Sequence, residues 1–417
     1  MENGGDADDV KPYNESKSNA EEIITALCDF TGEGEEQLSF SKGDHIKILQ
    51  KTTESWWWAE INGKHGYVPA NYVSSPKRIL WQDEEYFGNY GNLKLHHEML
   101  KDHPRTMAYF NAIVSNADFL DGKVVLDIGC GTGILSMMCA KHGNPKMVYA
   151  VEASVVAEQT KHVIEENGLS DKIKVIHGYA EDVVLDSDVD IIISEWMGTV
   201  LLFEMMIESV INMRDRYLKV DGVIWPSTAS LYLVPCSANE KYNDLIGFWD
   251  TQFGFDYSCF KDVAKEDLLS KPFHNYILPK EDCLCSGEPL FQLDMKSVTV
   301  QCIEEISSDF SFTITKPGVS LMHGFCAWFE VIFNPSNPDG IEVSLNTGPH
   351  HDLTHWKQNL FLLNDPMKVK QDDIVSGTFT LSRNPEFRRH LRAILSLTVH
   401  SGNTQVEKVE KLFYIWR

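Results

Sequence analysis

Two acidic residues, Glu195 and Glu204, lie at the ends of the otherwise almost uncharged part of the segment SEWMGTVLLFE. Carboxylates in apolar surroundings are costly unless a cation lies between them. A guanidinium group suits such a place, because it is planar and presents five N–H donors that pair bidentately with carboxylates. The segment therefore predicts a loop that binds an arginine side chain.

A glycine-rich turn upstream predicts a cofactor site. The stretch KVVLDI predicts a buried strand, GCGTG a turn that contains Gly129 and Gly131, and the apolar residues from Ile134 a helix. Strand, glycine turn and helix form the first unit of a nucleotide-binding sheet. The third glycine comes one residue earlier than in a dinucleotide fingerprint, and the turn lacks a P-loop signature. Asp127, directly before the turn, would repel a pyrophosphate but suits the cationic end of S-adenosylmethionine (AdoMet).

Acidic residues near the ends of later strands complete this predicted site. The stretch VYAVE ends at Glu152, where an acid can bind both ribose hydroxyls. The stretch IKVIH precedes Glu181, which we expect to accept from the adenine amino group; a solvated loop acid is the alternative interpretation. A fourth strand, DVDIIIS, ends directly before Glu195. Ligands of open α/β sheets bind at the carboxyl ends of the strands, so we expect the cofactor's methyl group beside the two acids.

AdoMet beside a bound guanidinium predicts methyl transfer to arginine. An arginine nitrogen is a poor nucleophile because its lone pair is delocalised. Two carboxylates would draw positive charge away from one terminal nitrogen, which would then face the sulfonium methyl; positioning and electrostatics are the large terms in enzymes. A simpler interpretation, that Glu204 caps an apolar helix or faces solvent, stays open at this point.

Composition narrows the class of partner. The 417 residues carry a formal net charge of -24, which argues against direct nucleic-acid binding and favours Lys- and Arg-rich partners, although solubility alone would also explain it. The nine cysteines are scattered and form no C-x-x-C pair, and the sequence shows neither a secretory signal nor a membrane span, so we expect a nuclear and cytoplasmic protein. The histidines of GPHHDLTHW fit no common zinc spacing, and we expect no metal.

Residues 1–21 are polar and predict a disordered tail. Residues 22–76 contain ALCDF, an acidic loop, a tryptophan cluster, a hairpin turn at Asn62-Gly63 and GYVPANY. Together they resemble an SH3 domain, which implies binding of proline-rich ligands. By that resemblance the ligand shelf consists of Phe30, Trp56, Pro69 and Tyr72. Cys28 stands where the family usually has a shelf tyrosine.

The rest of the chain predicts two further parts. Residues 83–224 have the pattern of a Rossmann-like, AdoMet-binding methyltransferase domain. Residues 225–417 alternate apolar and polar side chains between Gly and Pro turns, which is typical of an antiparallel β-barrel. A helical, aromatic insertion at about 238–260 interrupts the barrel. The predicted fold class is therefore multidomain: a small all-β SH3 barrel, an α/β domain and a β-barrel.

Residues 83–417 resemble protein arginine N-methyltransferases nearly end to end, and the SH3 module resembles that of the SH3-bearing members. The shared motifs are YFxxY (Tyr86 to Tyr90), HEMLKD (97–102), VLDIGxGTG, the double-Glu loop and THWKQ (354–358). The resemblance implies that Arg105 binds the AdoMet carboxylate and that His96 lies against the cofactor. It also implies that the insertion at 238–260 is an arm that forms a homodimer.

The same resemblance implies how substrate is handled. Met99 and Met206 would crowd a pocket in a way that accompanies asymmetric dimethylation, and His355 with Asp102 would accept the released proton. Tyr90 and Trp356 would complete the substrate pocket. The implied substrates are histones and other Arg-rich or Gly-Arg-rich proteins, with S-adenosylhomocysteine (AdoHcy) as the second product.

Two alternatives remain open from the sequence. Thr199 and Phe203 stand where tyrosines are frequent in the double-Glu loop, so the protein could be a weakly active scaffold or transcriptional coregulator with a partly decayed catalytic half. A small-molecule methyltransferase is the other, and the double-Glu pair and the long barrel argue against it.

Overall fold

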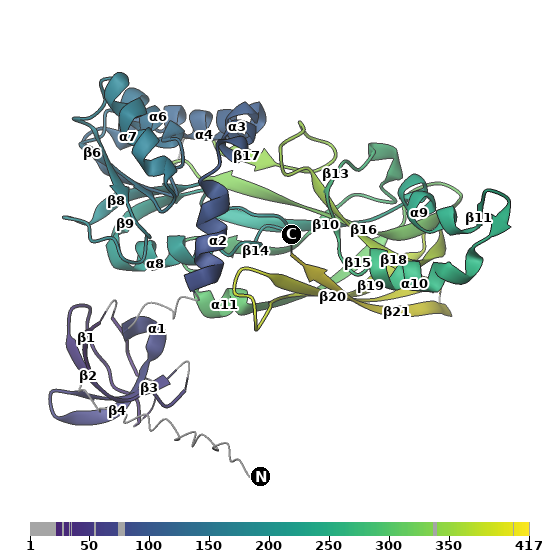
Figure 1. The fold of residues 1–417 in the computed structure, drawn as a ribbon, viewed down its shortest axis with the longest axis horizontal. Coiled ribbons are helices and arrows are strands. Elements are labelled where there is room, and N and C mark those ends of the chain that lie inside the picture. Colours follow the sequence, from purple (N-terminus) through teal and green to yellow (C-terminus); the bar gives the residue numbers. More distant parts are fainter. Residues whose placement is uncertain are drawn as a thin grey trace, which may run out of the picture. The chain divides into compact units, whose positions relative to one another are not determined.

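The structure is a computed structural model that describes residues 22–26, 29–32, 34, 36–53, 56–73, 80–336, 340–402 and 404–416. The chain forms two compact units, Met1–Arg78 and Ile79–Arg417, and each is treated by itself (Figure 1). The predicted tail at 1–21, the boundary near 76 and Cys28 lie outside the described residues. Within the described part, no helix is long and apolar enough to cross a bilayer.

The first unit is a four-stranded antiparallel sheet in the order β1-β2-β3-β4. Asn62 and Gly63 both have positive φ, 51° and 80°, and they form the predicted tight turn between β3 and β4. Trp57 points into the core beside Ile46 and Val68. The elements are β1 (Glu22–Thr25), β2 (His45–Gln50), β3 (Trp56–Ile61), β4 (Lys64–Pro69) and α1 (Ala70–Val73).

The second unit begins with helices and a five-stranded parallel sheet in the order β7-β6-β5-β8-β9. The central strands β5 and β8 are apolar and almost fully buried, as expected for strands covered on both faces. The helices are α2 (Leu80–Tyr90), α3 (Leu93–Lys101), α4 (His103–Ser115), α5 (Ala117–Leu120), α6 (Ile134–His142), α7 (Val156–Glu166) and α8 (Ile207–Tyr217). The strands are β5 (Val124–Ile128), β6 (Met147–Glu152), β7 (Ile173–His177), β8 (Val189–Ser194) and β9 (Leu218–Trp225). The predicted Rossmann-like fold is confirmed.

Two antiparallel sheets form the barrel, as predicted. One has the order β13-β18-β16-β10-β14 with β17 beside β16, and the other has the order β15-β19-β20-β21. Phe325 and Phe361, from the first sheet, pack with Phe310, Phe379 and Phe413, from the second. The strands are β10 (Thr228–Cys236), β13 (Phe273–Tyr276), β14 (Glu288–Asp294), β15 (Glu305–Thr313), β16 (Val319–Phe333), β17 (Val343–Asn346), β18 (Gln358–Lys370), β19 (Ile374–Arg383), β20 (Leu391–Ser401) and β21 (Thr404–Ile415); η3 (Lys280–Asp282) and α11 (Val300–Glu304) lie between them.

The insertion after β10 projects at the end of the barrel far from the parallel sheet (Figure 1). It contains α9 (Asn239–Leu245), η1 (Gly247–Trp249), β11 (Thr251–Gln252), β12 (Phe255–Asp256), η2 (Ser258–Phe260) and α10 (Lys261–Leu268). Phe253 is 97% exposed and Phe255 is 69% exposed. Large apolar side chains at such exposure are typical of a surface that another protein covers.

Candidate active site

The segment between β8 and α8 folds into a tight loop that carries both acids. The amide of Gly198 donates to the carbonyl of Leu201 at 2.9 Å, which turns the chain back on itself. Glu204 and Met205 have φ values of 75° and 54°, and left-handed backbone at a non-glycine residue costs about 1–2 kcal/mol. Glu204 lies in this strained loop, three residues before α8 begins at Ile207, so it does not cap the helix.

Glu195 is held by a buried cation. Nε and Nη2 of Arg105 donate to Oε2 of Glu195 at 3.1 and 2.8 Å. Burial alone would lower the pKa of Arg105, but the Glu195 charge raises it above its ordinary value. The expected contact of Arg105 with the cofactor's carboxylate stays a prediction; the structure shows that Arg105 lies against Glu195, the acid expected to bind the substrate.

Glu204 is held from two sides. The hydroxyl of Tyr90, on α2, donates to its Oε2 at 2.7 Å. Burial, followed by the charge of Glu204, raises the pKa of Tyr90 well above its ordinary value, so this hydroxyl keeps its proton. The main chain of Glu204 bonds to Arg389, between β19 and β20. Both acids line one cavity, together with Tyr90, Met99, Met206 and Trp356.

The glycine turn forms the floor of the same cavity. The amide of Gly131 donates to Oε2 of Glu152 at 2.8 Å, and Ser154 donates to the other oxygen of that acid at 2.8 Å. Gly131 has a φ of 52°, and a Cβ there would lie 3.1 Å from Cε1 of His96. A Cβ at Gly129 would meet Met206 at 2.2 Å. A close backbone approach and an acid at the strand end are what the ribose and amino-acid parts of AdoMet require, so these residues fit that cofactor.

Asp127 lies beneath the turn and does not line the cavity. It is fully buried, and its Oδ2 accepts from the amide and the hydroxyl of Ser136 at 3.1 and 2.6 Å. Its Oδ1 has no hydrogen-bond partner among the described residues. Burial raises the pKa of Asp127 to about 7, although the bonds from Ser136 act in the opposite direction. Its direct contact with AdoMet stays a prediction.

Glu181 also lines the cavity. The hydroxyl of Ser209 donates to its Oε1 at 2.6 Å. Its proposed bond to adenine also stays a prediction. Thr199 lines the cavity as well, whereas Phe203 does not and stacks on His390 with ring centroids 6.1 Å apart. Phe203, which stands where a tyrosine is frequent in similar loops, therefore faces the barrel and not the cavity.

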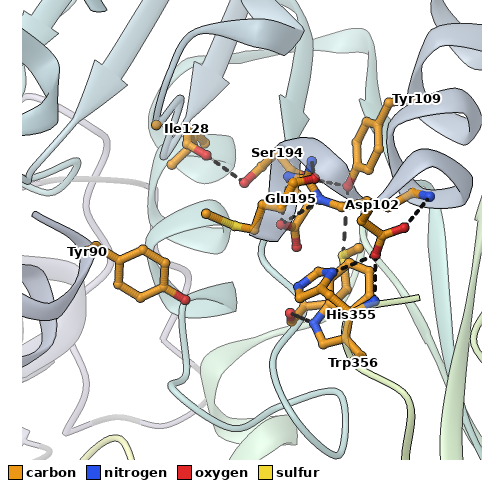
Figure 2. A network of polar contacts seen from close by, with 12 residues as sticks. Tyr90, Asp102, Tyr109, Ile128, Ser194, Glu195, His355 and Trp356 are labelled. Atoms are coloured by element: carbon orange, nitrogen blue, oxygen red, sulfur yellow. Dashed lines mark hydrogen bonds and ion pairs between the residues drawn. The ribbon is translucent and has the colours of Figure 1, made fainter. Parts of the chain in front are cut away.

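The barrel contributes His355 to a histidine–aspartate pair, and its partner Asp102 lies between α3 and α4. Nδ1 and the amide of His355 bond to Oδ2 of Asp102 at 2.6 and 2.8 Å (Figure 2). Burial would raise the pKa of Asp102, but these bonds lower it below its ordinary value. Trp356 donates to the carbonyl of Met197 at 2.9 Å and so fastens the barrel to the double-Glu loop. No cluster of three or more His, Cys, Asp or Glu side chains that could hold a metal occurs in the described ranges.

The four predicted shelf residues of the first unit come together. The ring of Phe30 lies 6.0 Å from that of Trp56 and 5.3 Å from that of Tyr72. Trp56 stands opposite Pro69 in the pairing of β3 with β4. Trp57 is buried in the core, while Trp58 is half-buried and packs against Tyr67. Binding of a proline-rich ligand stays a prediction.

Sequence reasoning missed Arg389 and Asp83. Arg389 reaches Glu204 across 185 positions of the chain and Asp83 across 306. The NPEFRRH stretch that contains Arg389 carries no recognisable motif. The only sequence signal for a role of this stretch is the run of three basic residues, Arg388 to His390, in an acidic protein.

Family models match consecutive parts of the chain. A model described as "Variant SH3 domain" matches residues 23–75, one described as "Ribosomal protein L11 methyltransferase (PrmA)" matches residues 102–226, and one described as "Arginine methyltransferase oligomerization subdomain" matches residues 227–402. The matched regions correspond to the SH3 unit, the parallel sheet and the barrel.

Relatives cover almost the whole chain. Protein arginine N-methyltransferase 2 of Homo sapiens is 47% identical over 403 residues, which cover 95% of this chain and 93% of the relative. The protein of the same name from Xenopus laevis is 44% identical over 421 residues, which cover 99% of this chain and 96% of the relative.

Solved structures of arginine methyltransferases are similar to this chain. The Trypanosoma brucei PRMT1 enzyme–prozyme heterotetrameric complex with AdoHcy matches with a TM-score of 0.71 at 31% identity, covering 79% of this chain and 100% of that chain. Arabidopsis thaliana protein arginine methyltransferase 10 matches with a TM-score of 0.72 at 31% identity and the same coverage.

Proposed function

The chain belongs to the protein arginine N-methyltransferase family and is an AdoMet-dependent arginine methyltransferase with an SH3 domain, and from this premise we propose that it converts arginines of protein tails into mono- and asymmetric dimethylarginine. One observation carries the proposal: Glu195 and Glu204 line one cavity with the glycine turn and with Met99 and Met206.

The residues of the cavity divide the chemistry between them. AdoMet supplies an electrophilic methyl group when it is bound. Glu195 offers the guanidinium its Oε1, because Arg105 engages only Oε2. Glu204 offers a carboxylate that Tyr90 orients. His355, held by Asp102, is the group positioned to accept the proton that the methylated nitrogen releases.

Product analysis tests the asymmetric outcome. A Gly-Arg-rich peptide is incubated with the protein and AdoMet, hydrolysed, and analysed by mass spectrometry. Met99 and Met206 line the cavity, and Met206 lies against the glycine turn, so we expect both methyl groups on one nitrogen. Symmetric dimethylarginine in the hydrolysate would refute this part of the proposal.

The proposed partners follow from charge and surface. The net charge of -24 supports Arg-rich or Gly-Arg-rich proteins, including histones, as substrates. The Phe30–Trp56–Tyr72 cluster supports recruitment of proline-rich proteins. Exposed Phe253 and Phe255 on the insertion support a homodimer. Scattered cysteines support a nuclear and cytoplasmic location.

A further inference from the structure

Arg389, between two strands of the barrel, connects two parts of the active site, the double-Glu loop and helix α2. Its Nη1 donates to the carbonyl of Glu204 at 2.8 Å, and its own carbonyl accepts from the amide of Glu204 at 3.1 Å. The main chain of Glu204 is thus bonded on both sides to one residue. Glu204 has a φ of 75°, and such a strained backbone persists only where the surrounding structure holds it.

Two other nitrogens of the same guanidinium bind helix α2. Nε and Nη2 donate to Oδ1 of Asp83 at 3.1 and 2.7 Å, and the side chains of both residues are largely buried, with 13% and 4% exposure. Cζ of Arg389 also lies 3.9 Å from the centroid of the Tyr86 ring, within the range of a cation–π contact. Tyr86 and Tyr90 belong to this helix and line the cavity.

A lysine could not replace this arrangement. Three nitrogens of one planar group act at fixed angles, two toward α2 and one toward the double-Glu loop. An ammonium group is a single point with no such fork. The neighbouring loop residues reinforce the contact, because His390 stacks on Phe203, directly before Glu204.

We propose that Arg389 is a positioning residue for methyl transfer, which sets the orientation of the Glu204 carboxylate by clamping its backbone to α2. The inference rests on the proposed function, because it assigns Arg389 a role in gripping the substrate arginine. Arg389 acts through Glu204, and Arg389→Lys should therefore lower kcat/KM at least about tenfold, since a shift of about 1 Å can cost on the order of 10²-fold.

Arg388 provides a matched control on the same loop. Its Nε and Nη2 donate to Oε2 of Glu208 at 3.2 and 2.9 Å, and its side chain is 16% exposed. Glu208 does not line the cavity. Arg388→Lys therefore disturbs a comparable ion pair without touching Glu204.

A double-mutant cycle tests the inference on the full chain. The wild type, Arg389→Lys, Glu204→Gln and the double variant are compared by kcat/KM on a Gly-Arg-rich peptide and by calorimetric affinity for that peptide with AdoHcy present. We expect Arg389→Lys to lower both kcat/KM and peptide affinity when Glu204 is present. In the Glu204→Gln background, the same substitution should change both quantities less than about twofold. Arg388→Lys should lower the melting temperature by a similar amount with kcat/KM within about twofold.

Each contrary result is distinct. Full activity of Arg389→Lys, losses that multiply in the double variant, or an equal loss in Arg388→Lys would overturn the positioning role. If circular dichroism shows that Arg389→Lys does not fold, Asp83→Asn, which keeps Arg389 but removes its anion, must give the loss instead. A wild type that neither binds nor methylates the peptide would contradict the proposed function and with it this inference.

Discussion

Arg105 donates two hydrogen bonds to a single oxygen of Glu195, at 3.1 and 2.8 Å. The cation expected to hold the cofactor's carboxylate thus lies directly against the acid expected to hold the substrate. Their side chains are 6% and 9% exposed. We therefore expect charge at the cofactor end of the cavity to be coupled to charge at the substrate end.

Because of this ion pair, we expect Arg105→Ala and Arg105→Lys to differ in stability. Arg105→Ala leaves Glu195 buried without its partner and should reduce the free energy of unfolding by about 3–5 kcal/mol. Arg105→Lys keeps the charge and should lose less stability while still weakening AdoHcy binding. Urea denaturation and calorimetry measure the two effects. Equal stability of Arg105→Ala and wild type would show that the pair does not act as described.

Tyr90 should matter through Glu204. Tyr90→Phe removes a hydrogen bond to a charged group, which contributes about 1.5–3 kcal/mol to stability, so the melting temperature should fall. Because the Glu204 carboxylate also loses the bond that orients it, kcat/KM should fall roughly 10- to 100-fold. Tyr67→Phe, in the other unit, is a control of the same chemistry. Unchanged kinetics in Tyr90→Phe would mean that the 2.7 Å bond does not orient the acid.

Much of the site could be predicted from the sequence because its parts are local. Glu152 ends β6 and Glu195 directly follows β8, and both line the cavity, because ligands of such sheets bind at strand ends. The partners of the acids could not be predicted, because Arg105 and Tyr90 lie 90 and 114 positions from theirs.

The left-handed backbone at Glu204 could not be predicted either, since a non-glycine residue there carries no sequence signal. The burial of Asp127 beneath the turn depends on helix α6, whose Ser136 engages the carboxylate. The barrel strands could be predicted from the alternation of apolar and polar residues. The sequence does not indicate that the loop between β19 and β20 contacts the double-Glu loop.

Asp127 predicts a pH-dependent cofactor affinity. Its pKa of about 7 means that the carboxyl is partly protonated at pH 6.5, whereas a bound cation favours the charged form. AdoHcy affinity should therefore increase from pH 6 to pH 8, and binding at pH 6.5 should release protons, which calorimetry in buffers of different ionisation enthalpy detects. Asp127→Asn should remove this dependence. A wild-type affinity that is flat over this range, without proton release, would rule out the contact.

The Asp102–His355 pair predicts a different pH effect. The pKa of Asp102 is lowered in the folded chain, so its stabilising contribution is fully present above the unfolded value of about 3.9 and is lost as pH falls through the folded value. The difference in unfolding free energy between wild type and Asp102→Asn should therefore shrink as pH falls below about 4. A difference that grows toward acid pH would have the wrong sign.

Transfer of labelled methyl from AdoMet to arginine in a Gly-Arg-rich peptide, measured for wild type, Glu195→Gln and Glu204→Gln, tests the central claim most directly. Glu208→Gln is the control, because it removes a buried acid that lies outside the cavity. We predict label on arginine with the wild type and the control, and a loss of about 10²-fold or more with either cavity variant. Label that survives both cavity substitutions would contradict the two-carboxylate grip, and no label with the wild type would favour a scaffold.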